Sequence, residues 1–219
     1  MPSIQRRVLR AVMQFGFRQL YGNFAWMYDA VAAVVSLGEW KAWGRAAIPF
    51  ARAPVQGRPP RLLEIAHGPG HLQLALQQMG CRSVGIDLSP QMSALTRKRL
   101  RRAGYPVELA RASVYRLPFV DGAFDTIIST FPTEFILSVD MLAEASRVLA
   151  AGGRLVVVPH APERPALLLG WWARLSIWND LDRSAVRRLY ERAGFQLSVQ
   201  RAAAGRSGVA VWVCEKITL

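Results

Sequence analysis

The first 52 residues carry apolar positions at helical spacing. Polar side chains recur at every fourth position from Arg6 to Arg18, and large apolar side chains occupy the opposite side of the same stretch. This pattern predicts an amphipathic helix over residues 4–20. Two more apolar segments follow, and then a stretch rich in proline and glycine. We therefore expect a cap of two or three helices over residues 1–52 and a linker over 53–60.

Beyond the linker, short apolar runs alternate with amphipathic segments. Strands are predicted at 61–66, 81–88, 106–112, 123–130 and 154–160, and helices at 71–79, 89–104, 139–153 and 183–194. Two last strand-like runs, 195–202 and 208–217, are separated by a short turn, as in a hairpin. Strands that alternate with helices form a parallel sheet with helices on both faces. The sequence thus predicts one domain over 1–219. It is an α/β, Rossmann-like, doubly wound and mostly parallel seven-stranded sheet over 61–219, with one antiparallel strand in the C-terminal hairpin, plus the helical cap.

Composition narrows the class of protein. Of the 219 residues, 52% are hydrophobic, and the longest apolar stretches fall short of the roughly 20 residues that a membrane-spanning helix needs. The N-terminal segment lacks the apolar core of a secretory signal, so we expect a cytoplasmic protein. Cys81 and Cys214 stand apart from each other and from any metal-binding spacing. They are predicted to be buried free thiols, and no metal site is expected.

A formal net charge of +13 leaves three interpretations open. It suits RNA, an anionic membrane, or a surface that uses arginine for solvation. A nucleic-acid partner is disfavoured because there is no appended recognition module and no basic run interleaved with aromatic residues. The basic helix over 4–20 and the tryptophans of the cap favour peripheral contact with the inner face of an anionic membrane. No obligate protein partner is evident.

The segment 62–76, LLEIAHGPGHLQLAL, carries the most specific chemical signal. A buried strand ends near Ala66, passes through Gly68 and Gly70, and enters a helix. Glycines let the backbone approach a ligand closely, and the N-terminus of the following helix favours a carboxylate or phosphate. A dinucleotide site prefers a third glycine where this chain has Gln73. The loop therefore argues against a dinucleotide.

Asp87 ends the next strand, in VGIDLS. A carboxylate there lies beside the glycine loop and can accept hydrogen bonds from both hydroxyls of a ribose. A glycine loop followed by an acid roughly 20 residues later is a stronger signal than either alone. Together they predict a nucleoside site.

Four segments in order resemble the class I S-adenosylmethionine-dependent methyltransferases, closest to the small branch that contains quinone-biosynthesis and lipid methyltransferases. They are LLEIAHGPGHL, GIDLSPQM, LPFVDGAFDTIIS and RVLAAGGRLVVV, and they span about Arg61 to Gly153. The resemblance implies an enzyme that uses S-adenosyl-L-methionine as its cofactor and transfers the methyl group to an acceptor.

Cofactor contacts follow from the resemblance position by position. It assigns the methionine half to Glu64, Ala66, Gly68 and Gly70, the ribose to Asp87, the adenine face to Leu88 and Met92, and the adenine edge to Ser113 and Val114. Ser113 stands where the family commonly has Asp. Its hydroxyl would accept the hydrogen bond from the adenine amino group more weakly than a carboxylate would. His67 lies in the same loop and is counted among the cofactor-binding residues; it stands where the family has a small residue or Cys, and a cap of the loop is its alternative role.

The segment TFPTEF, at 130–135, follows the fourth strand, where the family places residues near the transferred methyl group. By resemblance Thr130 contacts the cofactor. The segment lacks the Asn-Pro-Pro-aromatic tetrapeptide of some amino-group methyltransferases, which disfavours adenine or protein-amide methylation. Tyr28 matches a cap tyrosine whose hydroxyl can reach the cofactor carboxylate, and packing of the cap is the alternative role.

Methyl transfer from a sulfonium is an in-line displacement, so alignment and desolvation can carry the catalysis. A base is needed only if the acceptor is a hydroxyl or a similar protonated group. His160 and Glu134 are the candidate bases, because both follow strands at the edge of the sheet where ligands bind.

The methyl acceptor stays open at this point. The favoured hypothesis is a small or lipid-like hydrophobic acceptor, such as a lipid headgroup amine or a quinone, that enters beneath the cap. The alternatives are an RNA methyltransferase and a non-catalytic nucleoside-binding protein. Degraded motifs would indicate the last, and only Ser113 departs from the pattern in a way that matters.

Overall fold

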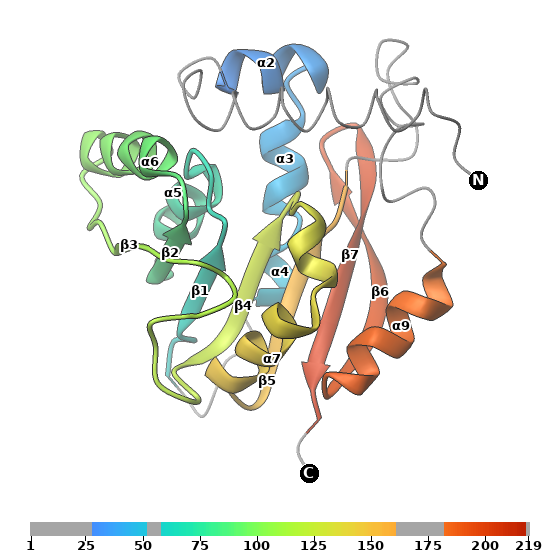
Figure 1. Cartoon of the computed structure of the whole chain (residues 1–219). Coiled ribbons are helices and arrows are strands. Elements are labelled where there is room, and N and C mark those ends of the chain that lie inside the picture. The colour runs from blue at the N-terminus through green and yellow to red at the C-terminus, as the bar shows by residue number, and fades with distance from the viewer. Residues whose placement is uncertain (1–27, 52–57, 161–181, 218–219) are drawn as a thin grey trace, which may run out of the picture.

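Seven strands form one sheet in the order β3-β2-β1-β4-β5-β7-β6 (Figure 1). The structure is a computed structural model that describes residues 28–51, 58–160 and 182–217. The strands are β1 (Leu62–Ile65), β2 (Ser83–Asp87), β3 (Leu109–Arg111), β4 (Phe124–Thr130), β5 (Leu149–Val158), β6 (Phe195–Ala204) and β7 (Ser207–Lys216). The helices are α2 (Tyr28–Val35), α3 (Trp40–Arg45), α4 (Ile48–Ala51), α5 (His71–Gln78), α6 (Pro90–Arg102), the 3-10 helix η2 (Glu134–Leu137), α7 (Val139–Val148) and α9 (Arg183–Arg192).

The pairing of the strands confirms the predicted fold class. β1 to β5 are parallel neighbours, and β7 runs antiparallel to both β5 and β6. β7 is therefore the one strand that opposes the others. The strand order reverses between β1 and β4, which makes the carboxyl ends of these strands a topological switch point.

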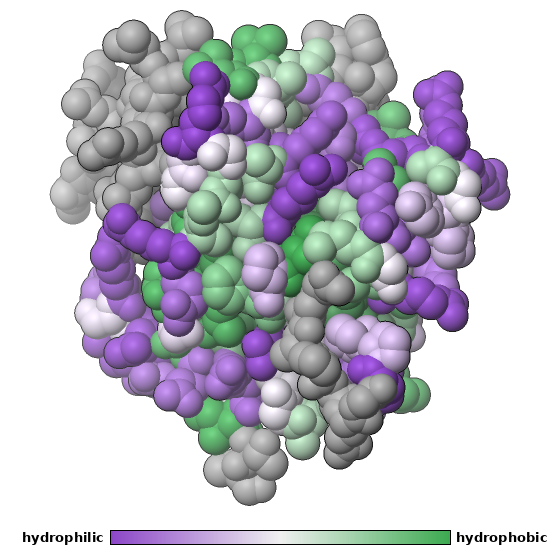
Figure 2. All heavy atoms as spheres, turned by 180° about the vertical axis from the view of Figure 1, so that it is seen from behind, coloured by the Kyte–Doolittle hydropathy of each residue, from purple (hydrophilic) through white to green (hydrophobic). Residues whose placement is uncertain are grey.

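Alternate side chains of the central strands pack on opposite faces of the sheet, as the two-residue period of a strand requires. In β1, Leu63 joins a core with α7 and α9, whereas Leu62 joins a core with α3, α4 and α5. Ile127 and Ile128 of β4 divide in the same way. Figure 2 shows the molecule from behind, where hydrophobic residues gather towards the middle of a largely hydrophilic surface.

Glu39 fastens the start of α3 to the turn between β6 and β7. Its carboxylate accepts hydrogen bonds from Arg206 Nε at 2.7 Å, from Ser207 Oγ at 3.0 Å and from Trp43 Nε1 at 3.1 Å. These contacts hold the pKa of Glu39 at about 2, below its usual range, with the Arg206 side chain as the largest cause. Helix α3 therefore has a fixed position over the sheet.

One predicted boundary is wrong. The helix expected over 139–153 ends at Val148, and β5 begins at Leu149, five residues before the predicted strand. The Lys216 ammonium donates to the carbonyls of Ser146 and Leu149, each at 2.7 Å, and so satisfies the end of the helix. Gly152 lies in the left-handed region, with φ at +68°, within the irregular start of β5. The glycine pair therefore shapes a strand and does not close the helix.

Several expectations fall outside the described residues. These are the amphipathic helix over 4–20, most of the 53–60 linker, and the cap tryptophan at position 26. Within residues 28–51, 58–160 and 182–217, no helix has the length and apolarity to cross a bilayer, and His, Cys, Asp and Glu form no group of three that could hold a metal ion.

Candidate active site

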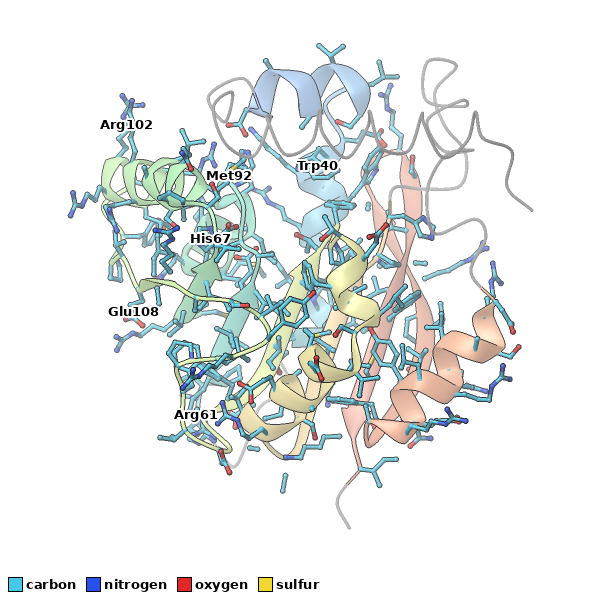
Figure 3. All side chains as sticks on the ribbon, viewed as in Figure 1. Trp40, Arg61, His67, Met92, Arg102 and Glu108 are labelled. Carbon is cyan, nitrogen blue, oxygen red and sulfur yellow. The ribbon has the colours of Figure 1, made fainter. Side chains whose placement is uncertain are left out.

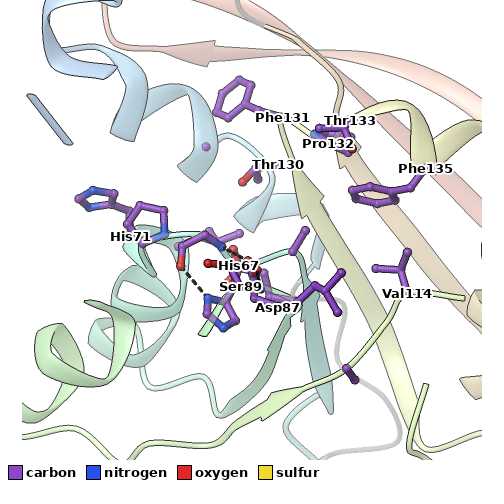
Figure 4. A pocket seen from close by; sticks show the side chains of 18 of the residues that line it. His67, His71, Asp87, Ser89, Val114, Thr130, Phe131, Pro132, Thr133 and Phe135 are labelled. Atoms are coloured by element: carbon purple, nitrogen blue, oxygen red, sulfur yellow. Dashed lines mark hydrogen bonds between the residues drawn. The ribbon is translucent and has the colours of Figure 1, made fainter. Parts of the chain in front are cut away.

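A cavity of about 550 Å³ opens at the carboxyl ends of β1, β2 and β4 (Figure 4). Its walls come from the glycine loop after β1, the end of β2, the loop 112–115, residues 130–135 after β4, and one side of α3. Ligands of open α/β sheets bind at this edge, at the switch point. The volume suits a drug-sized small molecule.

The loop after β1 has a left-handed backbone at three positions, with φ of +55° at Ala66, +54° at Gly68 and +77° at Gly70. A Cβ on Gly68, which lines the cavity, would meet no atom within 4 Å. A Cβ on Gly70 would lie 2.3 Å from Thr96 Cγ2 in α6. Gly68 therefore leaves room for a ligand, whereas Gly70 lets α5 and α6 pack closely and lies outside the cavity wall. Ala66 adopts an unfavourable backbone for a residue with a side chain, as is common at ligand sites.

Asp87 is held against the glycine loop. Its Oδ2 accepts a hydrogen bond from the Gly68 N–H at 2.8 Å, and its Oδ1 accepts one from the Ser89 N–H at 2.8 Å. An ionised carboxylate has about four acceptor sites, so capacity remains for two ribose hydroxyls. Ser89 also caps α6, since its Oγ accepts from the Met92 N–H at 3.2 Å. The predicted ribose ligand Asp87 and the cap of α6 thus share one short turn.

Glu64 lies at the bottom of the cavity and is 1% exposed. Burial raises the pKa of its carboxyl to about 8, and the nearby charge of Asp87 also raises it. Its Oε2 has no hydrogen-bond partner among the described residues. A buried polar atom without a partner carries a desolvation cost, which a ligand with a charged donor would relieve.

His67 is buried beneath the loop and supports it. Its Nδ1 lies 2.8 Å from the Gly68 carbonyl oxygen and 3.2 Å from Thr96 Oγ1, and Thr96 Oγ1 donates to the same carbonyl at 2.8 Å. Gly85 on β2 leaves space for the His67 ring, because a Cβ at that position would lie 3.0 Å from His67 Cδ2. Burial lowers the pKa of His67, so the neutral ring is favoured. The interpretation of His67 as a loop cap agrees with these contacts.

The two residues predicted for the adenine face lie in different places. Leu88 is 65% exposed and borders the cavity. Met92 is 1% exposed and packs against Ala32 and Leu95, outside the cavity wall. Its neighbour Gln91 lines the cavity instead.

At the predicted adenine edge, both Ser113 and Val114 line the cavity. Ser113 Oγ accepts a hydrogen bond from the Tyr115 N–H at 3.3 Å, which shapes the turn. Figure 4 shows Val114 and Phe135 on the side of the cavity opposite His71.

The far wall is built by the end of β4 and by α3. Thr130, Phe131 and Pro132 lie together there (Figure 4). The Phe131 ring stacks on Trp40 of α3, with ring centroids 3.8 Å apart and planes at 27°. Phe131 has φ of +52°, an unusual value for a large side chain, and its N–H donates to the Val158 carbonyl at 2.8 Å. A strained backbone that aims an aromatic ring at a cavity is typical of a ligand site.

The cap helix α2 is tied to the loop through Asp29. His71 Nε2 lies 2.7 Å from Asp29 Oδ1, and Arg99 of α6 pairs with Asp29 Oδ2 while also donating to the Pro69 carbonyl. The hydrogen bond from His71 is the largest cause that holds the pKa of Asp29 at about 2. Tyr28 begins α2, but its side chain lies outside what the structure describes.

Neither candidate base lines the cavity formed by the described residues. Glu134 is exposed at the start of η2, and half-buried His160 lies two residues beyond the end of β5. Their role as bases stays a prediction.

Residues of α3 and α5 complete the site, and sequence reasoning missed them. Trp40, Lys41, Gly44 and Arg45 line the cavity from α3, and His71 lines it from the start of α5. The spacing of the α3 residues places them on one side of a helix. This spacing can be read from the sequence, but it does not show which side of the cap helix faces the body of the protein.

A nucleoside joined to an amino acid fits this arrangement. Asp87 offers acceptors for sugar hydroxyls, and Gly68 leaves room for close approach. The Glu64 oxygen that has no partner among the described residues can accept a hydrogen bond from a cationic donor. The N-terminus of α5 favours a carboxylate.

Comparison with known proteins finds similarity to methyltransferases. Residues 63–157 match the family model described as "Methyltransferase domain". The chain is 35% identical over 146 residues to a demethylmenaquinone methyltransferase of Thermus thermophilus, covering 65% of each protein. It is 30% identical over 147 residues to a ubiquinone/menaquinone biosynthesis C-methyltransferase of Geobacter sp., covering 64% of this chain and 61% of the relative. The chain thus spans slightly less than two thirds of these relatives.

Solved structures share the fold. An S-adenosyl-L-methionine-dependent methyltransferase structure from Methanococcus maripaludis superposes with a TM-score of 0.64 at 17% identity, covering 91% of this chain and 95% of that one. The YcgJ protein of Bacillus subtilis superposes with a TM-score of 0.60 at 17% identity, covering 81% and 99%.

Proposed function

We propose, for a chain whose core is a class I S-adenosylmethionine-dependent methyltransferase domain, that it methylates a ring carbon of a quinone-like acceptor in its reduced, hydroxylated form. The match to a methyltransferase domain supports the predicted cofactor class. The acceptor is suggested by the names of the curated relatives, which act in quinone biosynthesis.

The observation that carries the proposal is the aromatic wall beside the cofactor end of the cavity. Trp40 and Phe131 stack face to face, and Pro132 and Phe135 continue the wall. A flat, apolar ring packs well against such a surface. The wall lies at the end of β4, where methyl transfer is expected.

The bound cofactor supplies an activated methyl group on a positively charged sulfur. Asp87 and the glycine loop hold its nucleoside end, Glu64 its ammonium, and the aromatic wall aligns the acceptor ring. With the acceptor ring aligned, the ring carbon would take the methyl group and form a C–C bond, while the cofactor sulfur would keep the electron pair of the broken methyl–sulfur bond. The ring carbon would then lose its proton to water at the open mouth. Alignment of the two reactants carries this chemistry.

A lipid-like acceptor would approach from the cap. Val34 and Leu37, at the end of α2 and beyond it, are 69% and 53% exposed. Arg102 points outward from the basic helix α6 (Figure 3). We expect the protein to bind vesicles that contain anionic lipid, to lose that binding in high salt, and to bind less when residues 1–20 are deleted.

The proposal is tested by incubation with labelled S-adenosylmethionine and candidate acceptors under reducing conditions. A short-chain 2-prenyl-1,4-dihydroxynaphthalene should gain one methyl group on carbon, as seen by mass spectrometry of the organic extract. Phosphatidylethanolamine vesicles form the parallel arm. Label in the lipid amine and none in the naphthoquinol would show that the acceptor is a lipid headgroup and not a quinone-like ring.

A further inference from the structure

Two cations of α3 lie on the cavity wall without an acidic partner among the described residues. Lys41 and Arg45 are one helical turn apart, both are exposed, and both line the cavity. No carboxylate in the described part of the chain forms an ion pair with either of them. Arg99, Arg147 and Arg206 are each paired by contrast.

The two cations lie four residues apart in α3, a spacing at which like charges repel each other. Glu39 ties the start of this helix to the β6–β7 turn. Two cations on one turn of a helix that lines a cavity raise the positive potential there, which favours an anion.

Residues next to the pair in α3 contact the aromatic wall that the acceptor is proposed to meet. Trp40 stacks on Phe131, and a Cβ on Gly44 would lie 3.9 Å from Phe131 Cε2. Burial lowers the pKa of His71 at the start of α5, and the charge of Lys41 adds to this effect. The N-terminus of α5 is the site that we propose for the cofactor carboxylate, so the acceptor oxygen and that carboxylate are the two anions to be distinguished at this pair.

We propose that Lys41 and Arg45 form an anion subsite that receives the ionised hydroxyl of the methyl acceptor. This inference rests on the proposed function and narrows its substrate class to aromatic rings with an acidic hydroxyl beside the carbon that is methylated. The hydroxyl gives its proton to solvent, and the resulting oxygen anion directs electron density to the neighbouring ring carbon. That carbon then forms the bond to the methyl group. The cations stabilise the anion before the methyl group is transferred, so they favour the reactive form of the acceptor.

The test compares the double variant Lys41→Gln/Arg45→Gln with a control of equal net charge, Lys98→Gln/Arg101→Gln. Lys98 and Arg101 are exposed on α6 and lie outside the cavity wall. The acceptor is the short-chain 2-prenyl-1,4-dihydroxynaphthalene, and its dimethyl ether serves as a ligand that cannot ionise. Affinity for S-adenosylhomocysteine is measured in parallel by calorimetry.

We expect the double variant to lose about 10- to 100-fold in kcat/KM for the naphthoquinol, the value of one charge-assisted hydrogen bond. Binding of S-adenosylhomocysteine and of the dimethyl ether should stay unchanged, and the control should behave like the parent. The naphtholate absorbance reports the pKa of the hydroxyl of the bound acceptor. In the parent this pKa should lie below that of the acceptor in solution by about 1 unit or more, and in the double variant it should equal the solution value.

Three outcomes would overturn the inference in distinguishable ways. Unchanged kcat/KM in the double variant removes the anion subsite and leaves the proposed function in place. An equal loss of S-adenosylhomocysteine affinity assigns the cations to the cofactor carboxylate. A parent protein that binds cofactor but neither binds nor methylates the naphthoquinol removes the proposed function, and this inference with it.

Discussion

The carboxylate of Asp87 accepts a hydrogen bond from the backbone N–H of Gly68, with 2.8 Å between Oδ2 and N. The contact joins the end of β2 to the loop after β1, two segments that are 19 residues apart in sequence. A contact within the protein itself therefore holds the acid and the glycine loop in register. Such preorganisation lowers the cost of ordering the site when the cofactor arrives.

Cofactor binding should release a proton from Glu64. Burial raises the pKa of its carboxyl to about 8, so at pH 7 the free protein holds the carboxyl mostly protonated. The ammonium of the cofactor favours the ionised form, so affinity should rise as the pH increases from 6 to 8 and level off above that. Calorimetry at pH 7 in buffers of different ionisation enthalpy measures the released proton. Glu64→Gln should abolish the dependence on buffer, and a parent without that dependence would contradict the role given to Glu64.

Asp29 should hold α2 over the glycine loop through its contacts with His71 and Arg99. Its pKa is lowered to about 2, so the ion pair with Arg99 persists at neutral pH and is lost only as the pH falls through about 2. The pair is half exposed, so Asp29→Asn should change global stability by less than about 1 kcal/mol. Hydrogen exchange of the α2 amides should become faster nonetheless. The matched variant Asp140→Asn, on the exposed first turn of α7, should leave exchange in α2 as it is. Unaltered exchange in Asp29→Asn would show that other contacts hold the cap.

Ser113→Asp should keep or improve affinity for the cofactor, because it places a stronger acceptor at the predicted adenine edge. Ser113→Ala should cost about 1 kcal/mol or less, the net value of one neutral hydrogen bond. Titration of each variant with S-adenosylhomocysteine measures both effects. A loss beyond about tenfold in Ser113→Asp, equal to 1.4 kcal/mol, would mean that the 112–115 loop meets the ligand differently.

The alternation of apolar strands and amphipathic helices was enough to predict the seven-stranded sheet and its antiparallel strand. The glycine loop and Asp87 were found because their chemistry depends on local backbone and short spacing. Met92 shows where such reasoning stops. Its position on α6 was right, but the helix turns it into the core against Leu95 and presents Gln91 to the cavity. Packing against the core decides which of two neighbouring helix residues faces the cavity, and the motif does not encode that packing.

The cap was harder to predict than the body. Glu39 joins α3, which carries Trp40, Lys41 and Arg45, to a turn located 167 residues later in the chain. No local pattern reports a contact of that range. The boundary of α7 was missed for a similar reason, since Lys216 comes from the far end of the chain to satisfy the carbonyls of Ser146 and Leu149.

The most direct test of the central claim is calorimetric titration of the parent and of Asp87→Ala with S-adenosylhomocysteine, with NAD as the dinucleotide control. The parent should bind S-adenosylhomocysteine in the micromolar range and NAD poorly. Asp87→Ala should lose about 2–4 kcal/mol of binding free energy, because two charge-assisted hydrogen bonds to the ribose disappear. The matched variant Asp140→Ala should bind like the parent, and circular dichroism should show that both variants are folded. If folded Asp87→Ala binds as tightly as the parent, or if the parent prefers NAD, the assignment of this cavity to S-adenosylmethionine is wrong.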